Sequence, residues 1–155
     1  MSDARWTEVD KDIDNALMHF DLAVRIFQTG EFDSSDILES YKSSSGLMHG
    51  MDAGYTSIEN AIQRILRILG ETPPSEGKSW HKDLIARVTT PMKGSNARPA
   101  FFDRDLRDDL LECMKMRHLV RHRDYGEFDP GKAGPSVDAA RRIVLADATL
   151  HFPVG

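Results

Sequence analysis

Apolar residues at three- and four-residue spacing dominate the N-terminal part of the chain, and this spacing places them on one face of an α-helix. The stripe ends before Gly30, a residue type that commonly follows the last turn of a helix. It consists of Trp6, Val9, Ile13, Leu17, Phe20, Val24 and Phe27. No segment of the sequence shows the two-residue alternation of a half-buried strand. The pattern therefore predicts a fold of packed helices.

A second apolar stripe begins after polar residues that can cap a helix and ends at Gly70. Its members are Leu38, Tyr41, Met48, Met51, Tyr55, Ile58, Ile62, Ile65 and Leu69. Residues 43–46, three serines and a glycine, weaken its middle, so a break near residue 45 is one interpretation. Close packing is the other, because Gly46, Gly50 and Gly54 repeat every four residues and form a ridge that another backbone can approach.

Three shorter helices are expected beyond loops rich in proline and glycine. They run from Trp80 to a stop at Pro91, from a cap at Asp103 to near Tyr125 or Gly126, and from Pro135 through Ala148 to a point before Pro153. With 155 residues and a 40% hydrophobic composition, the chain is in the size range of one domain. We therefore expect an all-α protein, an antiparallel up-and-down bundle of four to five helices over residues 1–155.

The composition limits the classes of function. The single cysteine, Cys113, lies on an apolar stripe, so neither a disulfide framework nor a cysteine metal site is expected. No signal-peptide pattern and no apolar run of about 20 residues is present, which predicts a soluble cytoplasmic protein without a membrane partner. The net charge of −5 argues against broad adhesion to nucleic acid. Any contact with RNA must therefore be local.

The fourth predicted helix carries such a local basic cluster near its end. Residues 115–123 contain no acidic residue and hold Lys115, Arg117, His118, Arg121, His122 and Arg123. On a helical projection, Arg117 lies near the centre of an apolar stripe formed by Phe102, Leu106, Leu110, Cys113, Met114 and Val120. An arginine is almost never fully buried unless it is paired. Arg117 therefore needs a carboxylate partner or a cleft.

The segment Arg117-His-Leu-Val-Arg-His122 resembles the motif of the HEPN superfamily, an arginine followed after four to six residues by a histidine near a helix end. The wider pattern is similar to the HepT-like ribonuclease toxins over most of residues 50–130. It includes Trp80-His81, Arg98-Pro99, Tyr125, Phe128 and Asp129. Two positions depart from the family: His118 stands where a polar amide is common, and Tyr125 lies three residues beyond His122 instead of two.

The resemblance implies metal-independent RNA cleavage, without a cofactor, by attack of the ribose 2′-hydroxyl on the adjacent phosphorus in a homodimer cleft. It assigns Arg117 and His122 as catalytic, with His118 as polar support. Histidine can exchange protons near neutral pH, and the planar guanidinium can clamp phosphate oxygens. Arg121 and Arg123 are candidates for contacts to the RNA backbone. The family also implies a nucleotidyltransferase antitoxin that adds adenylate to a motif tyrosine, which Tyr125 alone could match.

Helix geometry explains why a second copy would be needed. Arg117 and His122 are rotated about 140° apart with a rise of about 7.5 Å, so they do not share one face of an ideal helix. Convergence requires a distorted helix end, the reach of the arginine, or a facing cluster from another protomer. A neighbouring seam of the helix, formed by Leu111, His118 and His122, could be the dimer face.

Several other interpretations stay open. Arg117 could form a buried ion pair with a carboxylate such as Asp14 or Glu59. His118 and His122 could chelate a metal, although no Glu-x-x-His completes a carboxylate site. We expect His81 to be a structural or capping side chain. For the whole protein, the alternative is a noncatalytic HEPN module that helps a nucleotidyltransferase hold its substrate.

Overall fold

A computed structural model describes residues 4–95, 97–122 and 129–146, with the backbone alone described for 118–122. It contains the α-helices α1 (Ala4–Thr29), α2 (Ile37–Ile68), α3 (Trp80–Thr89), α4 (Arg104–His122) and α5 (Gly134–Leu145), and a 3-10 helix, η2 (Pro130–Lys132). The described residues form no β-strand, and Met92 and Arg98 make an isolated antiparallel bridge. The prediction of an all-α fold with five packed helices is confirmed.

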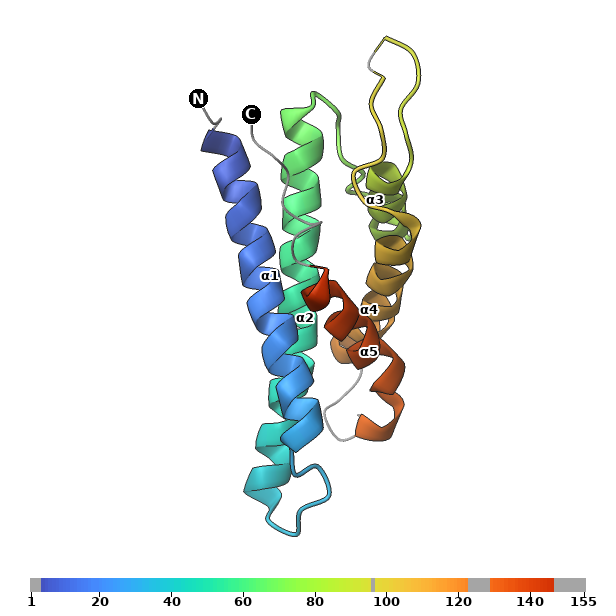
Figure 1. The fold of residues 1–155 in the computed structure, drawn as a ribbon. Helices are drawn as coiled ribbons and strands as arrows, with labels where there is room; N and C mark the ends of the chain where they lie inside the picture. The colour runs from blue at the N-terminus through green and yellow to red at the C-terminus, as the bar shows by residue number, and fades with distance from the viewer. Residues whose placement is uncertain (1–3, 96, 123–128, 147–155) are drawn as a thin grey trace.

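The two long helices α1 and α2 lie side by side and run in opposite directions (Figure 1). The predicted stripe of α1 faces this contact: Val9, Ile13 and Phe20 are completely buried. The helix ends where the backbone N–H of Gly30 donates to the carbonyl oxygen of Ile26. The apolar periodicity of the sequence thus determined both the length of α1 and the face that it buries.

The structure decides between the two interpretations of α2, which is one continuous helix. The N-cap of α2 is Asp36, whose carboxylate accepts a hydrogen bond from the backbone N–H of Leu38 at 3.0 Å. A Cβ atom placed on Gly50 would lie 2.9 Å from the Cβ of Ala23 and 3.0 Å from the carbonyl oxygen of His19. The glycine ridge therefore serves the close approach of α1, and the alternative interpretation, a break near residue 45, is wrong.

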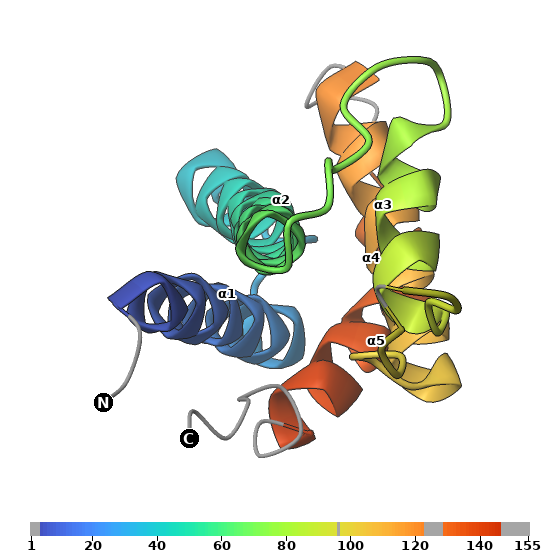
Figure 2. The ribbon, with the colours of Figure 1, turned by 90° about the horizontal axis from the view of Figure 1, so that it is seen from above.

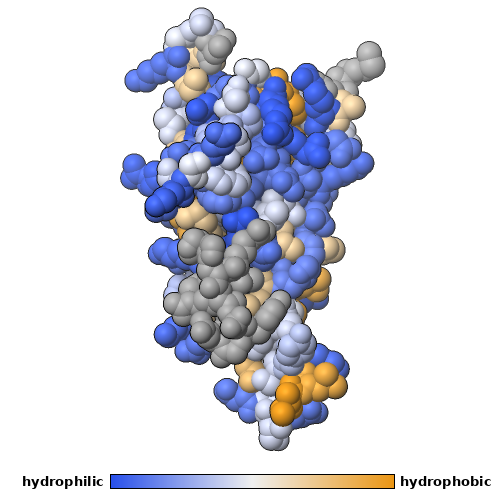
Figure 3. Space-filling model, turned by 180° about the vertical axis from the view of Figure 1, so that it is seen from behind, coloured by the Kyte–Doolittle hydropathy of each residue, from blue (hydrophilic) through white to orange (hydrophobic). Residues whose placement is uncertain are grey.

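The first turn of α2 differs from the prediction. Leu38 and Tyr41, which we expected on the buried stripe, are exposed, and their neighbour Ile37 is 84% exposed. The reason is length: Gly46 packs on Ile26 near the end of α1, so the residues before it extend past that helix. Figure 3 shows hydrophobic surface at this lower end of the molecule, where α2 begins.

The three shorter helices lie together on one side of the α1–α2 pair (Figures 1 and 2). α4 contacts α2, α3 and α5, and α5 also contacts α1. Because α4 is covered by three helices, its buried arc is wider than a single stripe: Met116 is buried, whereas the predicted Met114 is only partly buried. Leu111, placed on the possible dimer seam, packs partly against the core.

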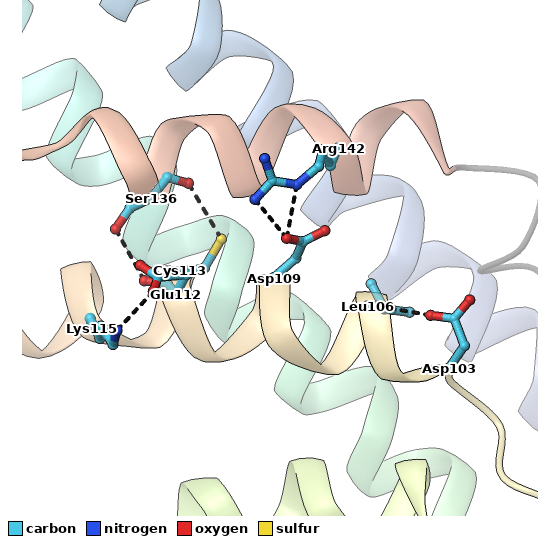
Figure 4. A network of polar contacts seen from close by, with 8 residues as sticks. All are labelled: Asp103, Leu106, Asp109, Glu112, Cys113, Lys115, Ser136 and Arg142. Carbon is cyan, nitrogen blue, oxygen red and sulfur yellow. Dashed lines mark hydrogen bonds and ion pairs between the residues drawn. The ribbon is translucent and has the colours of Figure 1, made fainter.

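Polar contacts join α4 to α5 and fix how α4 is rotated (Figure 4). Arg142 of α5 donates to Asp109 of α4 at 2.8 and 3.0 Å. The Ser136 hydroxyl donates to the carbonyl oxygen of Glu112 at 3.1 Å. α5 is described from Gly134 to Leu145, and Ala148, which we expected in the same helix, lies outside the described residues. No helix among the described residues is long and apolar enough to cross a membrane.

Candidate functional site

One face of α2 presents three residues to the neighbouring helices α3 and α4. Asp52, Tyr55 and Glu59 follow one another at intervals of three and four residues, which aligns them along a single face. Tyr55 is completely buried, and the side chain of Glu59 is 4% exposed. A carboxylate this deeply buried requires cationic or hydrogen-bonding partners.

Arg117 of α4 lies against this face, with 12% of its side chain exposed. Its Nε is 3.5 Å from a carboxylate oxygen of Asp52, and its Nη2 is 4.0 Å from Oε1 of Glu59. The guanidinium carbon also lies 5.5 Å from the centre of the Tyr55 ring. The buried ion pair considered from the sequence therefore exists, with Glu59 as one of the two expected carboxylates and Asp52 as a partner that we had not named.

His81, in the first turn of α3, completes the group. Its Nδ1 lies 2.5 Å from Oε2 of Glu59, and its Nε2 lies 3.4 Å from Nη1 of Arg117. The indole of Trp80 stacks on the imidazole, with the ring centres 3.6 Å apart. His81 thus touches both partners at once. We call Asp52, Tyr55, Glu59, His81 and Arg117 the Arg117 cluster.

One comparison with known proteins identifies the family of this chain. A family model described as HepT-like protein matches residues 46–149, more than half of the chain. The chain belongs to the HepT-like family. The matched segment contains all five residues of the Arg117 cluster, and the helix α1 precedes it. No curated protein and no solved structure matches the chain.

The structure places only part of the predicted HepT-like motif. Arg117 is in the cluster, whereas Lys115 is exposed and pairs with Glu112 at 2.7 Å on the same helix. The backbone of His118, Arg121 and His122 belongs to α4, but their side chains lie outside the described part of the chain. Arg123 and Tyr125 also lie outside the described residues. The convergence of Arg117 and His122 therefore stays a prediction.

We expected His81 to be a structural or capping side chain. The N-cap of α3 is Ser79, and the imidazole joins Glu59 to Arg117, which agrees with a structural role and adds a contact to Arg117 that we had not predicted. The available signal was the Trp80-His81 pair within the resemblance. For Asp52, the signal was its spacing from Tyr55 and Glu59 on one helical face.

A second buried arginine shows how unusual the environment of Arg117 is. Arg98 is 8% exposed and forms hydrogen bonds with both carboxylate oxygens of Glu71, at 2.7 and 3.2 Å, and with three backbone carbonyl oxygens. These five bonds match the five N–H groups of a guanidinium. Within the described residues, the Arg117 guanidinium makes one hydrogen bond, the long contact to His81, and its buried Nε has no acceptor.

The Tyr55 hydroxyl is also buried without a well-formed hydrogen bond among the described residues. Burial, and then the neighbouring Glu59 carboxylate, raise the pKa of Tyr55 far above its ordinary value. The phenol is therefore neutral at neutral pH. The described residues bring together no group of three or more histidine, cysteine or acidic side chains that could hold a metal ion.

Proposed function

We propose that this HepT-like chain is a metal-independent endoribonuclease toxin. The observation that best supports this function is the environment of the Arg117 guanidinium. The side chain is mostly buried, yet some of its N–H donors have no acceptor among the described residues. Buried polar groups are normally satisfied, and exceptions need an explanation. In contrast, every N–H donor of Arg98 has an acceptor, so the fold can satisfy a buried arginine that has a structural role. A phosphate of RNA would supply the acceptors that Arg117 lacks.

The proposed reaction needs one clamp and one proton-transfer group. Arg117 would bind the non-bridging phosphate oxygens and stabilise the charge that grows on them as the 2′-oxygen attacks. His122 would exchange a proton with the 2′-hydroxyl or with the leaving 5′-oxygen. The new 2′-oxygen bond to phosphorus forms as the bond to the 5′-oxygen breaks, which leaves a 2′,3′-cyclic phosphate and a 5′-hydroxyl end. His118 would give polar support.

The assembly belongs to the same proposal. We propose one HEPN-like domain over residues 1–155 acting as a homodimer, because His122 is rotated about 140° from Arg117 and displaced about 7.5 Å along α4. A second protomer would bring the facing motif into one cleft. Arg121 and Arg123 would contact the RNA backbone. A nucleotidyltransferase-type antitoxin would neutralise the toxin, with Tyr125 as the candidate acceptor of adenylate.

A second candidate function has its own supporting observation. Two carboxylates, Asp52 and Glu59, already face Arg117 and offset its charge within one protomer. This arrangement favours a noncatalytic HEPN module in which Arg117 organises the helices and the chain acts as the substrate-binding partner of a nucleotidyltransferase. Such a module would bind that enzyme tightly and would not cleave RNA.

The deciding experiment is RNA cleavage by the purified chain in buffer with EDTA. We expect products with 2′,3′-cyclic phosphate and 5′-hydroxyl ends, and loss of cleavage in His122→Ala and Arg117→Lys, because lysine keeps the charge but not the planar fork. Lys115→Ala is the matched control, since Lys115 is an exposed cation two residues before Arg117. Circular dichroism must show that each variant is folded. Full activity in folded His122→Ala would refute the catalytic assignment.

A further inference from the structure

The Glu59 carboxylate divides its two oxygens between two helices. Oε2 faces Nδ1 of His81 on α3, and Oε1 faces Nη2 of Arg117 on α4. His81 closes the triangle through Nε2, which lies 3.4 Å from Nη1 of Arg117. We propose that Glu59 and His81 are positioning residues that orient the Arg117 guanidinium for phosphate, an inference that rests on the proposed ribonuclease function.

One protonation pattern of His81 would satisfy both of its contacts. An ionised carboxylate only accepts hydrogen bonds, so the short contact with Glu59 requires a proton on Nδ1. The guanidinium only donates, so the contact with Arg117 requires a bare lone pair on Nε2. The neutral tautomer with the proton on Nδ1 satisfies both contacts. An imidazolium would set two donors against each other at Arg117.

The surroundings hold this tautomer in place. Trp80 stacks on the imidazole and limits its rotation, while Glu59 is 4% exposed and shielded from competing water. Within the described part of the chain, the charged groups in contact with His81 are Glu59 on α2 and Arg117 on α4. In this tautomer, the lone pair of Nε2 faces Nη1 of Arg117.

This arrangement has a consequence for Arg117. In this tautomer the imidazole accepts a hydrogen bond from Nη1, and Nε has no hydrogen-bond acceptor among the described residues. Asp52 on the other side is 3.5 Å away, longer than the usual N–H to oxygen distance of about 2.9 Å. The described residues thus orient the Arg117 side chain without occupying all of its N–H donors. Orientation of this kind is what transition-state binding requires, because misplacement by about 1 Å can lower a rate about 100-fold.

Two amide substitutions test the contacts of the two His81 ring nitrogens one at a time. In His81→Asn, the short amide can still donate to Glu59 but does not reach Arg117. In His81→Gln, the longer amide can offer its oxygen to Arg117 but gives up the contact to Glu59. We expect His81→Asn to lower kcat about tenfold or more with little change in KM, and His81→Gln to retain more of the activity. His49→Asn, on the exposed face of α2, is the control and should behave as the wild type.

The outcomes are distinguishable. If the wild type cleaves RNA and His81→Asn cleaves it with unchanged kcat, the positioning role is overturned while the ribonuclease function stands. Equal losses in both amide variants, accompanied by lower melting temperatures, would show a purely structural histidine and also overturn it. Absence of cleavage by the wild type would overturn the function and the inference together.

A spectroscopic measurement tests the same idea without activity. The ¹⁵N chemical shifts of the His81 ring, assigned by their loss in His81→Asn, report which nitrogen carries the proton. We expect the neutral ring to carry its proton on Nδ1. A ring protonated on Nε2, alone or together with Nδ1, could not accept a hydrogen bond from Arg117 and would overturn the proposal.

Discussion

Replacement of Gly50 by alanine should separate α1 from α2 and lower the stability of the protein. The added methyl group would meet the Cβ of Ala23 at 2.9 Å and the carbonyl oxygen of His19 at 3.0 Å, and neither atom can move without moving the helix. Overpacking of this kind costs about 1–3 kcal/mol. Alanine returns about 1 kcal/mol through its higher helix propensity. We therefore expect the free energy of unfolding to fall by about 1 kcal/mol.

Gly46→Ala is the matched control, one turn earlier in the same helix. Its methyl group would meet Cδ1 of Ile26 at 2.8 Å, which is the free end of a flexible side chain and can rotate away. The gain in helix propensity is the same in both variants, so their difference isolates the packing term. We expect Gly46→Ala to be as stable as the wild type or slightly more stable.

Thermal and urea unfolding followed by circular dichroism measure both variants. A difference of 1 kcal/mol corresponds to about 2–4 °C in Tm for a chain near this size. Equal stability of Gly50→Ala and Gly46→Ala would refute the close contact between α1 and α2, and with it our explanation for the glycine repeat.

Two further predictions concern ionisable groups outside the Arg117 cluster. Hydrogen bonding from Arg98 holds the pKa of Glu71 below its ordinary value, so the contribution of Glu71 to stability is present at neutral pH and is lost as the pH falls through that lowered pKa. The free energy of unfolding of Glu71→Gln, measured in urea, should therefore depend less on pH in acid than that of the wild type. Identical pH dependence of the two proteins would contradict this prediction. Burial, with smaller contributions from Asp109 and Glu112, raises the pKa of the Cys113 thiol. Alkylation of Cys113 at about pH 8 should therefore require unfolding, and its rate should increase with the urea concentration. Fast alkylation of the native protein would show that the thiol is accessible in the folded state.

The helices were predictable because their signals are local. Apolar spacing, an Asp36 cap and a terminal glycine each act within a few residues, and they placed α1 and α2 close to their observed bounds. Continuity through residues 43–46 was not predictable, because serine and glycine weaken a helix in isolation. The close contact with α1 stabilises that segment, and a sequence pattern does not reveal which helix will supply such a contact.

The exposed start of α2 shows a related limit. Leu38 and Tyr41 continue the apolar spacing, so they were expected in the core. Burial depends on what lies opposite, and α1 does not extend that far. Periodicity therefore predicts which face of a helix is apolar, while the relative lengths of neighbouring helices decide how much of that face is covered.

The sequence by itself determined the helices, the family and the prediction that Arg117 could not be a solvent-exposed arginine. Those conclusions follow from local spacing and from the free energy of burying a charge. Only the tertiary structure decided what surrounds that charge: Asp52 and Glu59 from α2, and His81 from α3. These residues are far from Arg117 in sequence, and their contacts with it depend on how three helices are rotated against one another, which packing of the whole core determines.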